Sequence, residues 1–140
     1  MRLLARSHQS EAVAELRRVP LLAGLHDRDL ERLDAGGFRR RFAEGQTIVI
    51  EGEPGSAFFI LLSGCASVSI GGSAVRTLHA GDTFGEIAAV GGRARTATVV
   101  AATDLECLVL PPWALRGFLA THGHVALALA RRLAVLAAAA

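Results

Sequence analysis

The chain has 140 residues, of which 51% are hydrophobic, so its length and composition fit one folded domain and exclude a disordered chain. The formal net charge is +2 and all 15 basic residues are arginine, a mild balance that does not call for a nucleic-acid partner. The apolar run at 133–140 is far shorter than the ~20 residues that span a membrane, and the initial MRLLAR is too short for a signal peptide, so we expect a soluble, cytoplasmic chain.

The first 37 residues indicate a helical segment. Residues 10–18, SEAVAELRR, predict a helix with Ser10 as its N-cap, and Pro20 interrupts it. The run DRDLERLDAGG predicts a second short helix, which ends at the glycine pair 36–37. We therefore assign residues 1–37 to an N-terminal helical segment.

From 38 to 111 the pattern changes to short runs of β-branched and apolar residues: QTIVI, AFFILL, ASVSI, AVRTL, TATVVAA and LECLVL. Turn-forming stretches such as EGEPGS, GGS and HAGD separate them, which favours an antiparallel sandwich or a small barrel. The dense run RRR at 39–41 is expected to be a solvated strand face. Cys65 and Cys107 lie in strand-like runs without metal spacing, so we expect free buried thiols in a reducing compartment.

The last segment, 112–140, returns to helical patterns. Pro111 and Pro112 end the last strand, WALRGFLATH predicts a helix, and an alanine-rich helix, HVALALARRLAVLAAAA, begins at His124. The final helix has an apolar stripe at spacings of four, four and three, formed by Val125, Leu129, Leu133 and Leu136.

The segment FGEIAAVGGRARTATV, 84–99, carries the chemistry. Residues 86–90 predict one helical turn ended by glycines 91–92, and a helix start offers unpaired N–H groups to an anion. Gly85 would let a ligand approach the backbone closely. Arg95 can donate two hydrogen bonds to two phosphate oxygens. One arginine suits a singly charged phosphodiester, and the Gly-Lys-Ser/Thr signature of triphosphate sites is absent.

Glu86 would repel a phosphate, so its place here requires a group that donates a hydrogen bond to it. A ribose hydroxyl is such a donor. Together these residues suggest a nucleotide whose phosphate lies close to its sugar. The residues alone leave a second interpretation open, in which Glu86 and Arg95 are merely solvated around a glycine loop.

The segment resembles the phosphate-binding cassette, here 84–98, of cyclic-nucleotide-binding domains, which occur in kinase regulatory subunits, gated channels and catabolite activator proteins. The family pattern is Phe-Gly-Glu, a small residue, then Arg, Ser/Thr/Ala and Ala; this chain has Phe84, Gly85, Glu86, Ala88, Arg95, Thr96 and Ala97. The stretches VPLLAGL, EGEPGSAFFILLSG and HAGDTFGE also match, so the likeness covers residues 15–138. It is nearest to the bacterial channel type. The resemblance implies a mainly β fold: an eight-stranded antiparallel jelly roll with N-terminal helices and two C-terminal helices.

The resemblance also implies roles for individual residues. Glu86 would accept a hydrogen bond from the ribose 2′-hydroxyl, and Arg95 would pair with the cyclic phosphate. The N–H groups of Gly85, Ile87 and Ala88 would complete the anion site, and the Thr96 hydroxyl would lie near phosphate and base. The base would be flanked by Val68 and Ile87 and covered by Leu136 on the last helix, which would act as a lid. Two departures, Ala94 in place of the usual proline and the extra Arg93, remove no ligand contact.

Other chemistries find less support. His122 and His124 have the spacing of a metal pair but no nearby Cys, Asp or Glu in the sequence, and the strand region contains only His79, too few for a jelly-roll metalloenzyme. We see no catalytic triad and no paired carboxylates, so we expect no enzyme and no metal. The 140 residues leave no room for a helix-turn-helix, so we expect no direct nucleic-acid contact.

The prediction is therefore a regulatory domain that binds a 3′,5′-cyclic nucleotide, with cAMP weakly favoured over cGMP. Its C-terminal helix would relay occupancy to an attached or partner effector such as a channel, transporter or enzyme. It would be cytoplasmic, as a free protein or as the cytosolic part of a membrane protein, and a homo-oligomer is compatible with this. The alternative is a ligand-free partner-binding or dimerisation module of the same fold.

Overall fold

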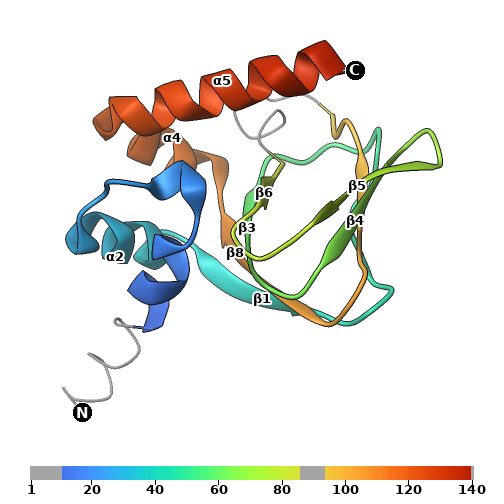
Figure 1. The fold of residues 1–140 in the computed structure, drawn as a ribbon, viewed down its shortest axis with the longest axis horizontal. Helices are drawn as coiled ribbons and strands as arrows, with labels where there is room; N and C mark the ends of the chain where they lie inside the picture. Colours follow the sequence, from blue (N-terminus) through green and yellow to red (C-terminus); the bar gives the residue numbers. More distant parts are fainter. Residues whose placement is uncertain (1–10, 86–93, 140) are drawn as a thin grey trace.

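The computed structural model describes residues 11–85 and 94–139, with side chains as far as residue 135. In these stretches eight strands form two four-stranded antiparallel sheets, in the orders β1-β8-β3-β6 and β2-β7-β4-β5 (Figure 1). The first sheet contains β1 (Phe38–Phe42), β8 (Leu105–Leu110), β3 (Phe58–Ser63) and β6 (Thr83–Phe84). The second contains β2 (Thr47–Val49), β7 (Thr98–Ala101), β4 (Ala66–Ile70) and β5 (Ser73–Leu78).

The helices gather on one side of this β-structure (Figure 1). Residues 11–17 are helical, a 3-10 turn η1 (Pro20–Leu22) begins at the proline, and α2 (Asp27–Ala35) follows. After β8 come α4 (Pro112–Thr121) and the long α5 (Gly123–Ala139). None of the described helices combines the length and apolar character needed to cross a membrane.

Strands β3 and β8 are buried on both faces, which explains why FFILL and LECLVL read as nearly continuous apolar runs. Alternate residues of a strand point to opposite faces. Phe58, Ile60, Leu108 and Leu110 therefore pack against the helices, in one cluster with Leu16, Leu30, Leu115, Val125 and Leu129. Their neighbours Phe59, Leu61, Cys107 and Val109 pack between the two sheets, in a second cluster with Val68, Leu78, Phe84 and Val99.

The second sheet buries only its inner face. In β4 and β7 buried residues alternate with half-buried ones, whereas β5 is exposed along its length except at Leu78. The helices thus cover the first sheet alone. The interior between the sheets forms a separate apolar layer.

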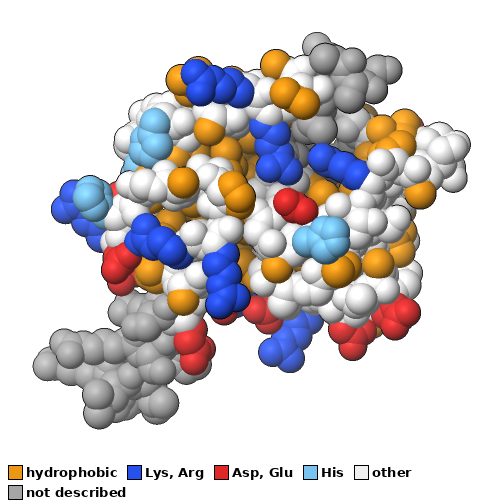
Figure 2. All heavy atoms as spheres, viewed as in Figure 1, with side chains coloured by type: hydrophobic (Ala, Val, Ile, Leu, Met, Phe, Trp, Pro, Cys, Tyr) orange, Lys and Arg blue, Asp and Glu red, His pale blue; other side chains and the backbone are white. Residues whose placement is uncertain are grey.

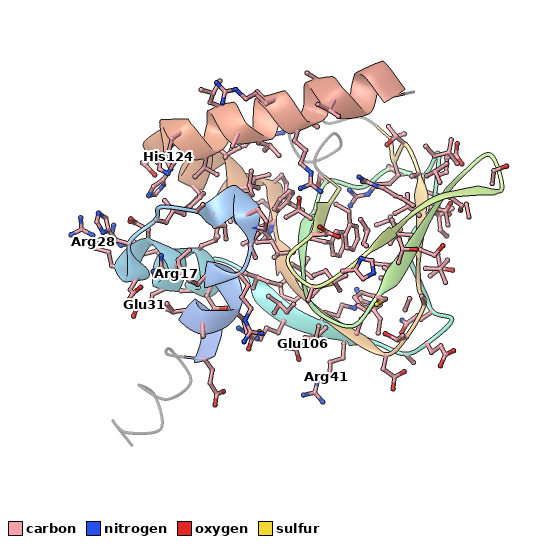
Figure 3. All side chains as sticks on the ribbon, viewed as in Figure 1. Arg17, Arg28, Glu31, Arg41, Glu106 and His124 are labelled. Carbon is pink, nitrogen blue, oxygen red and sulfur yellow. The ribbon has the colours of Figure 1, made fainter. Side chains whose placement is uncertain are left out.

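The predicted face at 39–41 is exposed at all three arginines, but two of them pair with carboxylates. Arg39 makes ion pairs with three carboxylates, on Glu15, Asp34 and Glu106. Arg41 pairs with Glu106 as well, and the two side chains lie together below β1 (Figure 3). These ion pairs join the N-terminal helices to the first sheet.

The expected fold is confirmed: mainly antiparallel β-structure with helices before and after it. The predicted strands ASVSI and LECLVL coincide with β4 and β8, and the helix predicted at DRDLERLDA coincides with α2. On α5, Val125 and Leu129 are buried and Leu133 is half-buried, as the apolar stripe predicted. The Ser10 cap and the helical turn at 86–90 lie outside the described residues.

Candidate functional site

Arg95 is the buried cation of the candidate site, with only 8% of its surface exposed. Its Nη2 donates a hydrogen bond to the carbonyl oxygen of Ala57 at 3.0 Å, and its Nη1 approaches the carbonyl oxygen of Gly85 at 3.5 Å, the outer limit for such a bond. Its Cζ lies 5.7 Å from the centre of the Phe59 ring, within the range of a cation–π attraction. The guanidinium is therefore held in one orientation by two carbonyl groups and a ring.

The backbone of Arg95 is fixed by the loop between β2 and β3. Its N–H donates to the carbonyl oxygen of Glu53 at 3.0 Å, and its carbonyl oxygen accepts from the N–H of Gly52 at 2.8 Å. One residue before Gly52, the N–H of Glu51 donates to the hydroxyl of Thr98 at 3.0 Å. This loop thus contacts Arg95 and the start of β7 through backbone groups, across more than 40 residues of sequence.

The charge of Arg95 is not neutralised by any carboxylate that the structure describes. Other arginines, such as Arg17, Arg39 and Arg41, have carboxylate partners within ion-pair distance, whereas the partners of Arg95 in the described residues are carbonyl groups and a ring. Burial lowers the pKa of Arg95 below its ordinary value, because removal from water disfavours the charged form. A buried cation with neutral partners attracts a small anion, since the anion supplies the missing counter-charge.

Gly85 stands where only glycine fits. Its φ of +84° is strained for any residue with a side chain, and a Cβ here would lie 2.7 Å from the Ala57 oxygen and 2.8 Å from Arg95 Nη1. The preceding residue, Phe84, stacks on Phe59 with ring centres 4.7 Å apart and an interplanar angle of 1°. The sequence identified Gly85 as a point of close backbone approach; within the described residues, the groups that approach are Arg95 and Ala57.

The other predicted site residues are placed as follows. Val68 is buried in the apolar layer between the sheets, opposite Val99 of β7, in the same cluster as Phe59 and Phe84. Thr96 is exposed, next to Arg95. Glu86, Ile87 and Ala88 lie outside the described residues, as does the side chain of Leu136. The structure therefore brings together Gly85, Arg95 and Phe59, and Phe59 belongs to an apolar wall that includes Val68.

Three contributors to the site were missed in the sequence: Ala57, Phe59 and Gly55, which lies against the Arg95 guanidinium. Ala57 acts through its backbone carbonyl, which no side-chain pattern reveals. Phe59 belongs to a continuous apolar run, in which the residue types do not show which side chains face the space between the two sheets. Gly55 was visible only as one turn residue within EGEPGS.

The histidine pair is engaged in other contacts. The Nε2 of His122 lies 3.3 Å from the Asp29 carboxylate on α2, and the His122 ring stacks on Phe118 with centres 4.2 Å apart. The ring of His124 meets that of His122 edge-on at 6.5 Å. Across residues 11–85 and 94–139 no cluster of three metal-ligating side chains occurs. Both cysteines are free, and Cys107 is buried.

A hollow of about 650 Å³ lies away from Arg95, beside the start of α2, and is lined by Arg17, Leu25, His26, Asp27 and Arg28. It is open to solvent. Arg17 is already engaged there by the Asp27 carboxylate and the Leu25 carbonyl oxygen. Figure 3 places Arg17 and Arg28 beside α2, at the opposite side of the view from β4 and β5. This hollow therefore lacks the unneutralised, buried charge of the Arg95 site.

The surface charge offers no broad basic patch on the face in view. Figure 2 shows arginine side chains scattered among hydrophobic and neutral ones across this face. A polyanion such as DNA is held by several phosphate contacts at once. The arrangement instead suits one small anion held at one arginine.

Comparisons with known proteins agree with this geometry. A family model described as "Cyclic nucleotide-binding domain" matches residues 39–122. The chain is 34% identical over 95 residues to a cAMP-dependent protein kinase regulatory subunit of Hypocrea atroviridis, a match that covers 68% of this chain and 21% of that protein. It thus spans about a fifth of the length of this curated relative.

Solved structures show the same fold. The regulatory domain of Toxoplasma gondii PKA, co-crystallised with cAMP, superposes with a TM-score of 0.81 and 25% identity, over 94% of this chain and 51% of that one. The catabolite activator protein of Thermus thermophilus gives a TM-score of 0.74 and 28% identity, over 82% of this chain and 56% of that one.

Proposed function

Because the chain belongs to the cyclic nucleotide-binding domain family, we propose that it binds a 3′,5′-cyclic nucleotide at Arg95 and signals occupancy to an effector. It is a regulatory module in this proposal, without a catalytic step. The relatives named above are kinase regulatory subunits and an activator protein, which supports a regulatory role. The ligand we favour is cAMP, with a weak preference over cGMP, and no metal is required.

The observation that carries the proposal is the buried guanidinium of Arg95, which no carboxylate among the described residues neutralises. Its donors are oriented by Ala57 and Gly85, and Phe59, part of an apolar wall that also contains Val68, lies beside it. A cyclic phosphodiester has one negative charge, which one arginine can neutralise. A nucleoside beside the phosphate would add apolar contact with such a wall.

The remaining contacts of the ligand are part of the same proposal. Glu86 accepts from the ribose 2′-hydroxyl, and the N–H groups of Gly85, Ile87 and Ala88 add to the anion site. Thr96 lies near phosphate and base. Val68, Ile87 and Leu136 contact the base. Since Leu136 has no polar group to read the base edge, discrimination between adenine and guanine is expected to be weak.

The signal is a change in the population of positions of α5. The ligand can shift that population only if it binds one position more tightly than the other. The effector is a channel, transporter, enzyme or separate protein. The domain acts in the cytosol, free or attached, and self-association is compatible with this role.

Calorimetric titration with cAMP, cGMP and 5′-AMP tests the proposal. We expect one site per chain for both cyclic nucleotides, tighter for cAMP, and weaker binding of 5′-AMP, whose phosphate has a different charge and shape. Absence of binding by both cyclic nucleotides at millimolar concentration would overturn the proposal. That result would favour a ligand-free interaction module of the same fold.

A further inference from the structure

Gly55 lies directly against the guanidinium of Arg95. A Cβ built at position 55 would lie 2.7 Å from Arg95 Nε, 3.1 Å from Nη2 and 3.2 Å from Cζ. Three atoms of the guanidinium therefore occupy the space that any side chain at 55 would enter. The shortest of these distances is below any contact that real Cβ atoms make.

The backbone conformation at 55 does not itself require glycine. Eight other described glycines, including Gly52 and Gly85, have a positive φ between +59° and +96°, and Gly55 is not among them. No positive φ therefore reserves position 55 for glycine. The three atoms nearest to a methyl group there all belong to Arg95.

We infer that Gly55 is a positioning residue for the anion site, and this inference rests on the proposed function. The absence of a side chain at 55 lets the guanidinium lie against the β2–β3 loop, where the Ala57 carbonyl accepts from Nη2. That fixes the plane of a group with five N–H donors, and the donors not used by the protein point to the ligand. The same loop fixes the Arg95 backbone through Glu53 and Gly52.

A positioning role and a structural role predict different effects of Gly55→Ala. The atoms that the new methyl group would meet are at the far end of a flexible side chain, so Arg95 moves and the fold stays. At Gly85, by contrast, an alanine would strain the backbone and meet the Ala57 carbonyl oxygen as well as Arg95. Gly55→Ala should therefore weaken ligand binding with little loss of stability, whereas Gly85→Ala should weaken both.

Calorimetric titration of Gly55→Ala with cAMP is the test. We expect the affinity to fall about 10- to 100-fold, the effect of misaligning a charged hydrogen-bonded pair. The midpoint of thermal unfolding should change by less than about 4 °C. Gly117→Ala on α4 is the matched control: it makes the same chemical change at a position with open space and no positive φ, so cAMP affinity should be unchanged. Equal affinity of Gly55→Ala and wild type would overturn the inference.

A double-mutant cycle with Arg95→Ala tests whether Gly55 affects binding through Arg95. Once the guanidinium is absent, the methyl group at 55 has nothing to displace, so Gly55→Ala should cost no further affinity in the Arg95→Ala background. If Gly55→Ala lowers cAMP affinity by the same factor in both backgrounds, Gly55 acts independently of Arg95 and the inference is wrong.

A readout without ligand keeps the inference distinct from the proposed function. If the wild type binds no cyclic nucleotide, the proposed function fails, but the contact can still be examined through the ¹⁵N–¹H resonance of Arg95 Nε. We expect this resonance to shift in Gly55→Ala and to stay in place in Gly117→Ala. An unshifted resonance, with a crystal structure showing the guanidinium unmoved, would refute the contact itself.

Discussion

The guanidinium of Arg132 on α5 donates a hydrogen bond of 3.1 Å to the carbonyl oxygen of Thr83 in β6. Thr83 lies two residues before Gly85, whose carbonyl oxygen faces Arg95. Between them, Phe84 stacks on Phe59, over whose ring Arg95 lies. The Arg132 side chain therefore joins the C-terminal helix to the strand that leads into the candidate site.

This contact predicts that Arg132→Ala loosens α5. Loss of a hydrogen bond from a charged donor should lower the free energy of unfolding by about 1–2 kcal/mol, measured by chemical denaturation. The neighbouring Arg131, exposed on the same helix, provides the control, and Arg131→Ala should change stability by less than about 0.5 kcal/mol. Equal effects of the two substitutions would contradict a role for the Thr83 contact.

Replacing Arg95 tests whether its guanidinium pairs with the phosphate of the ligand. Arg95→Ala should weaken cAMP binding by about 2–5 kcal/mol in calorimetry, the cost of removing one partner of a buried charge pair. Arg95→Lys should fall between wild type and Arg95→Ala, because it keeps the charge but loses the two-pronged donor geometry. An unchanged affinity in Arg95→Ala would mean that the phosphate binds elsewhere.

Replacing Glu86 tests the sugar contact. Glu86→Gln should weaken cAMP binding less than Arg95→Ala does, because an amide oxygen can still accept a hydrogen bond from the ribose. Its main effect should be a smaller preference for cAMP over 2′-deoxy-cAMP, measured by competition between the two ligands. If the variant loses the same factor of affinity for both sugars, Glu86 does not contact the 2′-hydroxyl.

The pair formed by Asp29 and His122 should make the contact between α2 and the α4–α5 junction sensitive to acid. Burial raises the pKa of Asp29, but the hydrogen bond and charge of His122, with smaller contributions from His26 and Arg28, outweigh it, so the net pKa lies below its ordinary value of 3.8. A carboxyl group whose pKa is lowered on folding stabilises the fold at pH values above its pKa in the unfolded state. This contribution is lost as the pH falls through the pKa of the folded state.

The measurement is the free energy of unfolding between pH 6 and pH 3 for wild type and Asp29→Asn. Wild type should lose more stability than Asp29→Asn on acidification, because the variant has no carboxylate to protonate. Glu31→Gln, on the same helix and exposed, should follow wild type (Figure 3). Parallel curves for wild type and Asp29→Asn would show that the His122 pair contributes nothing.

Cys107 should be inert toward thiol reagents in the folded protein. Burial, with a smaller contribution from the charge of Glu106, raises the pKa of Cys107 to about 12. At pH 8 the thiolate fraction is then about 10⁻⁴, and the thiolate is the reactive form. Mass spectrometry after iodoacetamide treatment should find Cys65, which is half-buried, labelled before Cys107. Labelling of Cys107 at the rate seen in denaturant would contradict its burial.

Secondary-structure elements that depend on nearby residues could be predicted from the sequence. The β4 and β8 runs, the proline at the start of α4 and the stripe Val125–Leu129 on α5 each depend on neighbours within a few positions. Periodicity and turn chemistry act over that range, so patterns of two or 3.6 residues predict strands and helices directly. The motif around Arg95 was identified by its resemblance to a family pattern, which was possible because the residues of that pattern lie within one short segment.

The groups that surround Arg95, by contrast, could not be predicted from the sequence. The contact with Ala57 spans 38 residues and that between Arg132 and Thr83 spans 49, and in both the acceptor is a backbone carbonyl, which every residue possesses. No side-chain type marks such an acceptor, and nothing in EGEPGS distinguishes Gly55, set against a guanidinium, from an ordinary turn glycine. Residue order thus determined the strands, the helices and the basic residue of the site. The folding of two sheets onto each other decided which carbonyls, ring and glycine surround it, because only packing brings distant backbone groups within hydrogen-bond range.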